Sequence, residues 1–173
     1  CRVFAKAMSN GIPVSAITGK KKYMKYLEST FFSFTYGGDC VGLAAAKACI
    51  NKLERKNVID HLYKVGRKLK NGMNKIIEMQ ELNEFLECSG YPCRTVMTIK
   101  NYKKYSKPLI IKTLIQQELM KRGVLWSQYH SMSYSHKNSH IENSLNAFED
   151  SLKVLKKIVM NYKNIENYLH GKP

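Results

Sequence analysis

The spacing of hydrophobic residues is most regular in the second half of the chain, where it predicts three helices. Apolar side chains recur every three or four positions over residues 58–76 and again over residues 141–162. This spacing places them on one face of an α-helix, opposite a face rich in lysine. A third helix is predicted over residues 108–120, with Ser106 as its N-cap and Gly123 as its C-terminal stop.

Short runs rich in β-branched and aromatic residues predict a small sheet beside these helices. The segment ELNEFLECSGYPCRTVMTIK predicts two strands around a Gly90-Tyr91-Pro92 turn, and VLWS and SMSYS predict two further short strands. Ser139 and Glu142 have the spacing of a capping box at the start of the last helix. From residue 57 onward, the pattern therefore predicts an α+β layer of three helices over a small sheet.

The first part of the chain has a different pattern. Residues 1–5 and 13–19 predict two short strands around a Ser-Asn-Gly turn, and KKKYMKYLE predicts a short helix. The small residues that follow position 41 predict a tightly packed helix. Because these elements do not belong to the layer predicted for the second part, we predict two domains, residues 1–56 and residues 57–173.

The charge of the chain changes this picture little. The net charge of +16 comes mostly from lysines, which are spread along the predicted helix faces. Only five residues are arginine, the side chain whose planar fork is favoured for reading base edges. This pattern disfavours nucleic acid as the partner, although a basic non-catalytic binding module stays an alternative function.

The cysteines indicate the compartment. They are five in number, widely scattered and never arranged as Cys-x-x-Cys, which predicts reduced thiols and neither a disulfide framework nor a zinc site. No apolar run approaches the roughly 20 residues of a membrane-spanning helix. We therefore expect a soluble cytoplasmic protein with no membrane partner. Since the chain starts at Cys with a motif-rich segment, we expect a piece of a longer protein.

One lysine stands apart from those on the solvated helix faces. Lys6 follows a short apolar run and precedes a Ser-Asn-Gly turn and Pro13. At a strand end flanked by alanines its amine would be partly desolvated, which favours the neutral nucleophile that a Schiff base requires. The alternative interpretation is a lysine with a buried stem whose amine reaches solvent.

A second candidate site lies in FFSFTYGGDCVGLAAA. The hydroxyls of Ser33 and Thr35, the glycines after them and the start of a helix form a plausible anion site, because backbone N–H groups and the helix dipole favour a phosphate there. The alternative is a glycine-rich turn with Asp39 as the helix cap. The segment contains no Walker or Gly-x-Gly-x-x-Gly pattern, so the sequence does not indicate a nucleotide loop.

Arg94 is the third candidate, because it enters an apolar strand after a rigid turn and needs a partner. A carboxylate is the natural bidentate partner, supplied either by a substrate or by a glutamate of the nearby ELNEFLE segment. His130, His136 and His140 lie in a serine-rich segment that predicts strand and turn. Their spacing suits a metal only on a helix, so we predict no metal site.

Taken in order, these features resemble the C-terminal part of a class III aminotransferase, a pyridoxal-phosphate-dependent enzyme of fold type I. The glutamate-1-semialdehyde aminomutase-like group is the most similar. FAKAMSNGIPVSAITGKKKYM resembles the segment around the cofactor lysine, and FFSFTYGGDCVGLAAAKACI resembles the phosphate-side segment and its helix. GYPCRTVMTI, IKTLIQQELMKRGVLW and SYSHKNSHIENSLNAFEDSLKVL resemble the small domain. The resemblance implies an α/β fold, with residues 1–56 as the end of the large domain and residues 57–173 as the α+β small domain.

The resemblance also implies site residues. Lys6 would form the Schiff base with pyridoxal 5'-phosphate and move the proton between the substrate and the cofactor. Thr35, with Ser33 close to it, would contact the cofactor phosphate of the neighbouring subunit, which implies a homodimer with shared active sites. Arg94 would lie near the substrate carboxylate, and His136 would pack the small domain.

The implied function is an aminotransferase that moves an amino group from an amino acid or amine to a keto or aldehyde acceptor. A glutamate-1-semialdehyde 2,1-aminomutase is the enzymatic alternative, although Ser33-Phe34-Thr35-Tyr36 stands where an aminomutase often has Gly-Thr. The family's phosphate loop, ring-stacking aromatic residue and ring-nitrogen aspartate would lie in a preceding segment. This chain alone is therefore not expected to transaminate, and its sequence does not specify the substrate.

Overall fold

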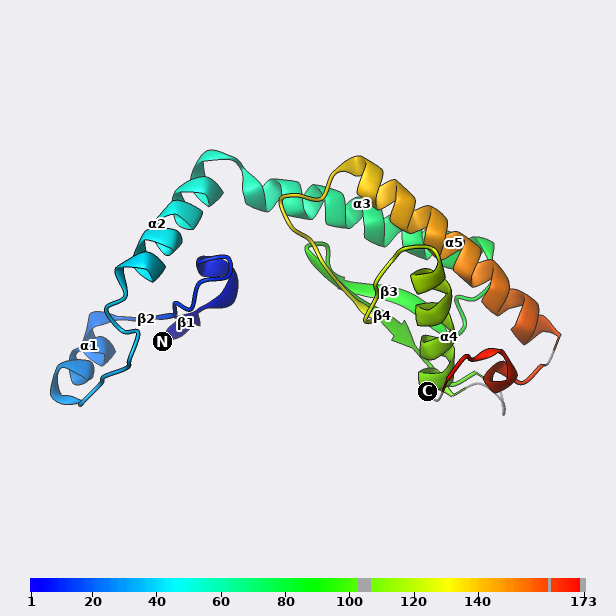
Figure 1. The fold of residues 1–173 in the computed structure, drawn as a ribbon, viewed down its shortest axis with the longest axis horizontal. Coiled ribbons are helices and arrows are strands. Elements are labelled where there is room, and N and C mark those ends of the chain that lie inside the picture. Colours follow the sequence, from blue (N-terminus) through cyan, green and yellow to red (C-terminus); the bar gives the residue numbers. More distant parts are fainter. Residues whose placement is uncertain (103–106, 162, 172–173) are drawn as a thin grey trace. The chain divides into compact units, whose positions relative to one another are not determined.

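The computed structural model describes residues 1–102, 107–161 and 163–171. The chain folds into two compact units, residues 1–59 and residues 60–173 (Figure 1). The domain boundary predicted after residue 56 falls in the short connection between helices α2 (Cys40–Arg55) and α3 (Val58–Met79).

The first unit is built on a two-stranded antiparallel hairpin. Strands β1 (Arg2–Phe4) and β2 (Ala16–Thr18) pair with Val3 opposite Ile17. A 3-10 turn over Lys6–Met8 follows β1, and a short helix α1 (Lys21–Met24) follows β2 and continues into a second 3-10 turn over Lys25–Ser29. The two predicted strands, the short helix and the helix that begins near residue 41 are confirmed.

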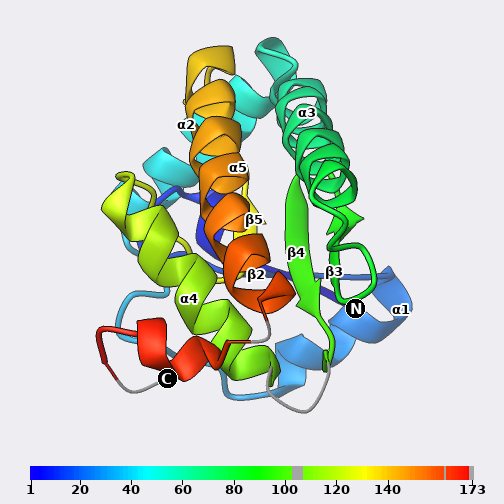
Figure 2. The same ribbon diagram turned by 90° about the vertical axis from the view of Figure 1, so that its right-hand side faces the viewer.

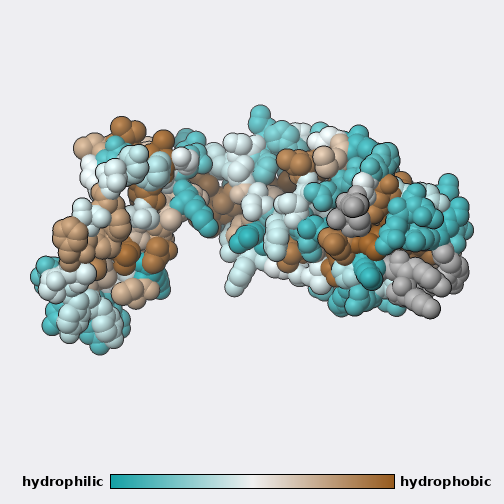
Figure 3. Space-filling view, turned by 60° about the horizontal axis from the view of Figure 1, so that its bottom comes forward, coloured by the Kyte–Doolittle hydropathy of each residue, from teal (hydrophilic) through white to brown (hydrophobic). Residues whose placement is uncertain are grey.

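The first unit buries few of its large apolar side chains. Its buried positions include Ser9, Gly42 and Ala46, whereas Phe31 is 94% exposed and Val3 is 71% exposed. Figure 3 shows hydrophobic residues, in brown, on the surface of this unit at the left of the view. Apolar surface on this scale is typical of a face that another part of a protein covers.

The second unit is an antiparallel sheet with helices on one face. The strand order is β3-β4-β5, and helices α3, α4 and α5 cover the same side of the sheet (Figure 2). The bounds of these elements are β3 (Leu86–Tyr91), β4 (Arg94–Ile99), β5 (Tyr129–Ser131), α4 (Pro108–Lys121) and α5 (Asn138–Met160). The predicted α+β layer is therefore confirmed.

The core of the second unit lies between these helices and the inner face of the sheet. The helices contribute apolar residues at spacings of three and four, and β3 and β4 contribute alternate residues. The buried residues include Leu69, Met73, Ile77, Leu86, Cys88, Met97, Ile111, Leu114, Ile115, Leu119, Phe148, Leu152 and Leu155. The opposite face of the sheet carries the intervening side chains and is not covered by these helices.

Several predicted details of the second unit differ from the structure. Neither VLWS nor most of SMSYS forms a strand, because the pairing with β4 falls between them, at Tyr129–Ser131. The last helix begins at Asn138, so Ser139 lies inside it and is not the cap. Instead, the His140 ring accepts a hydrogen bond from the backbone N–H of the N-cap residue Lys137. This is one half of a capping box, because a lysine ammonium cannot accept the reciprocal bond.

The predicted start and end of the third helix are met in part. Lys107 occupies the N-cap position of α4, and the predicted cap Ser106 lies outside the described residues. Gly123 follows the last turn of α4 with a φ of 77°, a left-handed conformation that glycine adopts without steric cost. Its predicted role as the C-terminal stop is therefore confirmed.

Candidate functional site

Lys6 lies at the first residue of the 3-10 turn after β1, and its backbone is unusual. Its φ is 56°, in the left-handed region that few residues other than glycine adopt. Its side chain is exposed, so the desolvation expected for this amine is not present in the structure, because the left-handed turn carries the residue off the strand. Within the described residues, Lys6 forms no ion pair. Its amine is therefore available to react.

The turn that carries Lys6 is fixed by a small set of hydrogen bonds. The backbone N–H of Ser9 donates to the Lys6 carbonyl at 3.3 Å, and the buried Ser9 hydroxyl donates to the Ile12 carbonyl. From α2, the Cys49 thiol donates to the Ala7 carbonyl at 3.3 Å. Asn10 and Gly11, with φ values of 52° and 115°, then reverse the chain toward β2. Strained backbone held by its surroundings in this way is characteristic of functional sites.

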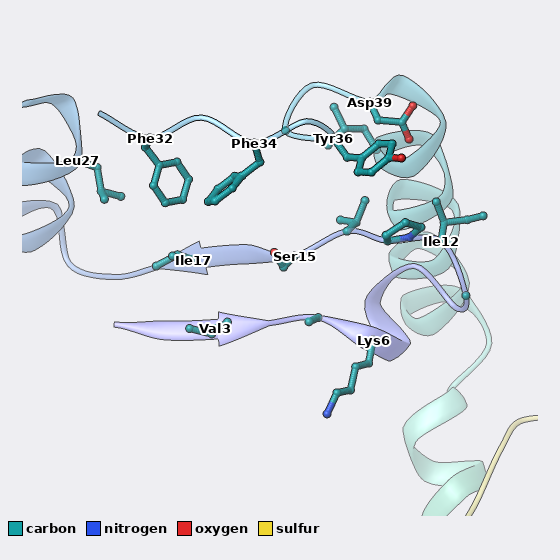
Figure 4. A pocket seen from close by; sticks show the side chains of 16 residues that line it. Val3, Lys6, Ile12, Ser15, Ile17, Leu27, Phe32, Phe34, Tyr36 and Asp39 are labelled. Carbon is teal, nitrogen blue, oxygen red and sulfur yellow. The ribbon is translucent and has the colours of Figure 1, made fainter. Parts of the chain in front are cut away.

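A pocket of about 1090 Å³ lies between the hairpin and the segment that precedes α2. Its lining includes Lys6, Val14 and Ile17 from the first segment and Phe32, Phe34 and Tyr36 from the second. Figure 4 shows the two phenylalanine side chains over β2, with the Lys6 side chain extending away from them on the far side of the hairpin. Lys6 and the 32–36 segment thus both contribute to the lining of one pocket, although the Lys6 amine points away from the aromatic rings.

Ser33 and Thr35 lie in this segment but do not line the pocket. Both are exposed, and they alternate with Phe32, Phe34 and Tyr36, whose side chains do line it. Thr35 and Tyr36 lie in a turn in which the Gly37 backbone N–H donates to the Phe34 carbonyl at 3.1 Å. Neither hydroxyl is therefore part of the lining of the pocket that includes Lys6.

Asp39 caps helix α2, as the alternative interpretation of this segment predicted. Its carboxylate accepts a hydrogen bond from the Gly42 backbone N–H at 2.7 Å. The helix N-terminus thus already holds a negative side chain, which satisfies one of its free N–H groups. The hydroxyls of Ser33 and Thr35 remain exposed.

Arg94 begins β4 in the second unit and is exposed. Among the described residues it forms no ion pair, so the salt bridge with a glutamate of the ELNEFLE segment, one of its two alternative partners, is not formed there. Its guanidinium carbon lies over the ring of Tyr129, 5.5 Å from the ring centroid. Lys6 and Arg94 therefore belong to different units, and each has its own set of neighbours.

His130 takes part in a buried polar chain that the sequence did not reveal. The Trp126 indole N–H donates to His130 Nε2 at 2.9 Å, and His130 Nδ1 lies 3.0 Å from the buried Thr95 hydroxyl. Burial lowers the pKa of His130 from 6.5 to about 4. The neutral ring thus accepts from Trp126 and donates to Thr95. Within the described residues, no group of three His, Cys, Asp or Glu side chains could hold a metal ion.

Two groups of residues near the candidate positions were missed by the sequence analysis. Phe32, Phe34 and Tyr36 were not singled out, although they line the same pocket as Lys6. The contact of Tyr129 with Arg94 left no sequence signal, because it depends on the register between β4 and β5.

Comparison with known protein families identifies the family of this chain. Residues 2–132 match the family model described as aminotransferase class-III, which includes Lys6, Ser33, Thr35 and Arg94. The chain belongs to the class III aminotransferase family. The resemblance inferred from the sequence is confirmed.

Curated relatives of this class III chain carry two kinds of name. It is 29% identical over 164 residues to a 3-aminobutyryl-CoA aminotransferase of Cloacimonas acidaminovorans, covering 90% of this chain and 38% of that protein. It is 28% identical over 170 residues to a glutamate-1-semialdehyde 2,1-aminomutase of Clostridium beijerinckii, covering 85% of this chain and 37% of that protein. The chain thus spans less than two fifths of the length of these relatives.

Solved structures share this fold. The FumI protein of Sphingopyxis sp. MTA144, in its PLP internal aldimine form, matches with a TM-score of 0.81 at 18% identity, covering 95% of this chain and 39% of that one. The predicted fold class, the C-terminal part of a fold-type I transferase, is therefore confirmed. None of the helices in the described residues combines the length and apolar character needed to cross a membrane.

Proposed function

We propose that the protein containing this chain is a pyridoxal 5'-phosphate-dependent aminotransferase. It moves an amino group from an amino acid or amine to a keto or aldehyde acceptor, and Lys6 is the residue that holds the cofactor. The observation that carries the proposal is Lys6 itself, an exposed amine without an ion pair in the described chain, on a left-handed turn inside the matched family segment. We also assign a role to each part of the chain: residues 1–56 complete the large cofactor-binding domain, and residues 57–173 form the small domain.

The residues present fit this cofactor chemically. A free amine can bond to the cofactor aldehyde, and exposed hydroxyls at Ser33 and Thr35 can donate to its phosphate. When bound, pyridoxal phosphate supplies an electron sink for the carbon that carries the amino group. Once the substrate amine has replaced it on the cofactor, the Lys6 amine would be free to act as the base that removes the proton from that carbon and would later return a proton.

We assign Thr35, with Ser33 beside it, to the phosphate of the neighbouring subunit in a homodimer with shared active sites. Two observations support this: neither hydroxyl lines the pocket that includes Lys6, and the first unit exposes a large apolar surface. Arg94 is assigned to the substrate carboxylate, since its guanidinium has no carboxylate partner in the described residues. We place the protein in the cytoplasm, in keeping with five free cysteines.

A glutamate-1-semialdehyde 2,1-aminomutase is the second candidate, because the relative in Clostridium beijerinckii bears that name. An external amino donor separates the two functions. An aminotransferase requires the donor for every turnover, whereas the aminomutase converts its substrate without one.

Borohydride reduction of the full-length protein with pyridoxal phosphate tests the assignment of Lys6. Reduction fixes the cofactor on the lysine that holds it, and peptide mapping then identifies that lysine. We expect the pyridoxyl group on the peptide that contains Lys6, and no labelling of this peptide in Lys6→Ala. A label on another lysine, or no label at all, contradicts the proposal.

A further inference from the structure

Arg94 and Tyr129 are diagonal neighbours on the face of the sheet that α3, α4 and α5 leave uncovered. Arg94 pairs with Ser131 across the β4–β5 ladder, and Tyr129 pairs with Val96. Side chains two positions apart on adjacent strands lie on the same face, within reach of long and aromatic groups. The contact at 5.5 Å between the guanidinium carbon and the ring centroid follows from this register.

The kind of contact matters for what Arg94 can bind. Attraction between a cation and a ring uses the charge of the guanidinium and none of its N–H donors. Arg122 shows the opposite case, because its Nη1 donates at 2.8 Å to both the carbonyl and the carboxylate of Glu118. The ring of Tyr129 therefore limits where the Arg94 guanidinium lies while leaving its donor fork available for a planar acceptor.

We propose that Tyr129 is a positioning residue for Arg94, and that the pair selects substrates that carry a carboxylate group. This inference rests on the proposed function, in which Arg94 contacts the substrate. Tyr129 acts only through Arg94. Its ring restricts the Arg94 side chain before the ligand arrives, so the arginine loses less conformational entropy on binding. The ring alone is needed for this, so phenylalanine at position 129 serves equally well.

Tyr91 provides a matched control on the same sheet face. It pairs directly with Arg94 across the β3–β4 ladder, and it is 74% exposed, against 53% for Tyr129. In the described part of the chain, the ring found under the Arg94 guanidinium is that of Tyr129. Removing the Tyr91 ring therefore changes the same surface without removing the proposed contact.

The test is the affinity of the full-length protein for glutarate, an unreactive dicarboxylate, measured by titration calorimetry at low salt. Loss of a cation–π contact at an exposed site predicts that Tyr129→Leu binds glutarate about two- to five-fold more weakly. Tyr129→Phe and Tyr91→Leu should match the wild type, and Arg94→Leu should lose most of the affinity. Tyr129→Thr, which suits an edge strand, gives a second measurement if the leucine variant folds poorly.

Three results overturn the inference: wild-type affinity in both Tyr129→Leu and Tyr129→Thr, an equal loss in Tyr91→Leu, or glutarate binding that survives in Arg94→Leu. The same titrations in a Lys6→Ala background separate this inference from the proposed function. Because a carboxylate contact at Arg94 does not need the Lys6 amine, the expected order of affinities should persist there. If the borohydride experiment labels another lysine or none, and the titrations give the expected order, then the role of Lys6 is refuted and the role of Tyr129 is not.

Discussion

The carbonyl of Pro92 occupies the place where a side chain at Gly66 would begin. A β-carbon added to Gly66 would lie 1.9 Å from the Pro92 carbonyl oxygen and 2.5 Å from its carbonyl carbon. Helix α3 thus meets the turn between β3 and β4 backbone to backbone. Gly66 lies inside a helix and Pro92 in a tight turn that joins two paired strands, so neither main chain can move without disturbing the elements it belongs to.

We predict that Gly66→Ala destabilises the second unit by about 2 kcal/mol, measured by urea unfolding. Alanine is the better helix former by about 1 kcal/mol, but overpacking against fixed main chain costs more than this gain. Gly72→Ala is the matched comparison on the same helix. Its added β-carbon would lie 2.6 Å from Leu145 Cδ1, the end of a side chain that can rotate, so the loss should be smaller. Equal stability of Gly66→Ala and wild type would contradict the packing described above.

His130 makes the stability of the second unit depend on pH. Its pKa is lowered to about 4 by burial, against an ordinary value of 6.5, so the unfolded chain binds its proton at higher pH than the folded chain does. The contribution of His130 to the free energy of unfolding is therefore fully present above pH 6.5 and is lost as the pH falls toward 4. The total loss is about 3 kcal/mol.

The measurement is urea unfolding at a series of pH values between 7 and 4, followed by the fluorescence of the single tryptophan, Trp126, which contacts His130. His130→Gln cannot titrate and should lose this part of the pH dependence. His140→Gln, at an exposed position, should retain it. The role of His130 is refuted if its replacement leaves the slope of stability against pH unchanged.

Helices and strands were predicted well wherever burial requires a regular spacing of apolar residues. The helix over residues 58–76, the hairpin around Gly90 and the last helix all appear, because each must turn a continuous apolar face toward one core. Short elements without such a face were less well predicted. The strand at Tyr129–Ser131 is only three residues long, and pairing with β4 decides its position more than its own composition does.

The roles of the candidate site residues stay predictions, and their geometry differs in part from what the sequence suggested. The resemblance to the family singled out Lys6, yet the expectation of a desolvated amine at a strand end failed, because a left-handed turn takes Lys6 out of the strand. The ring beneath Arg94 comes from a residue 35 positions later in the chain (129 − 94). Contacts set by strand register at this separation have no local sequence signal.

Ser9 holds the turn after Lys6, and we predict that Ser9→Ala lowers the transamination rate of the full-length protein about ten-fold. Its buried hydroxyl donates to the Ile12 carbonyl, and a buried acceptor left without a donor disturbs the loop that fixes the lysine. Ser29→Ala is the control. That hydroxyl makes a similar bond to the Tyr26 carbonyl at 3.1 Å, but it is exposed and does not belong to the Lys6 turn. Equal effects of the two substitutions would show that Ser9 does not position Lys6.

Thr35 permits a direct test of shared active sites. If its hydroxyl binds the cofactor phosphate of the neighbouring subunit, Thr35→Val should weaken pyridoxal phosphate binding about ten- to hundred-fold, the value of a hydrogen bond to a charged group. Thr35→Ser keeps the hydroxyl and should bind nearly as well as the wild type. Equilibrium titration of the cofactor, followed by its absorbance, measures both variants.

Mixing two defective variants then shows which subunit Thr35 serves. In a hybrid dimer of Lys6→Ala and Thr35→Val subunits, shared sites combine the intact Lys6 of one subunit with the intact Thr35 of the other, so one of the two sites is restored. At limiting cofactor, the mixture should therefore recover activity that neither variant has alone. If Thr35 served its own subunit, every site in the hybrid would lack one of the two groups. A mixture no more active than the average of its components would therefore exclude the shared arrangement.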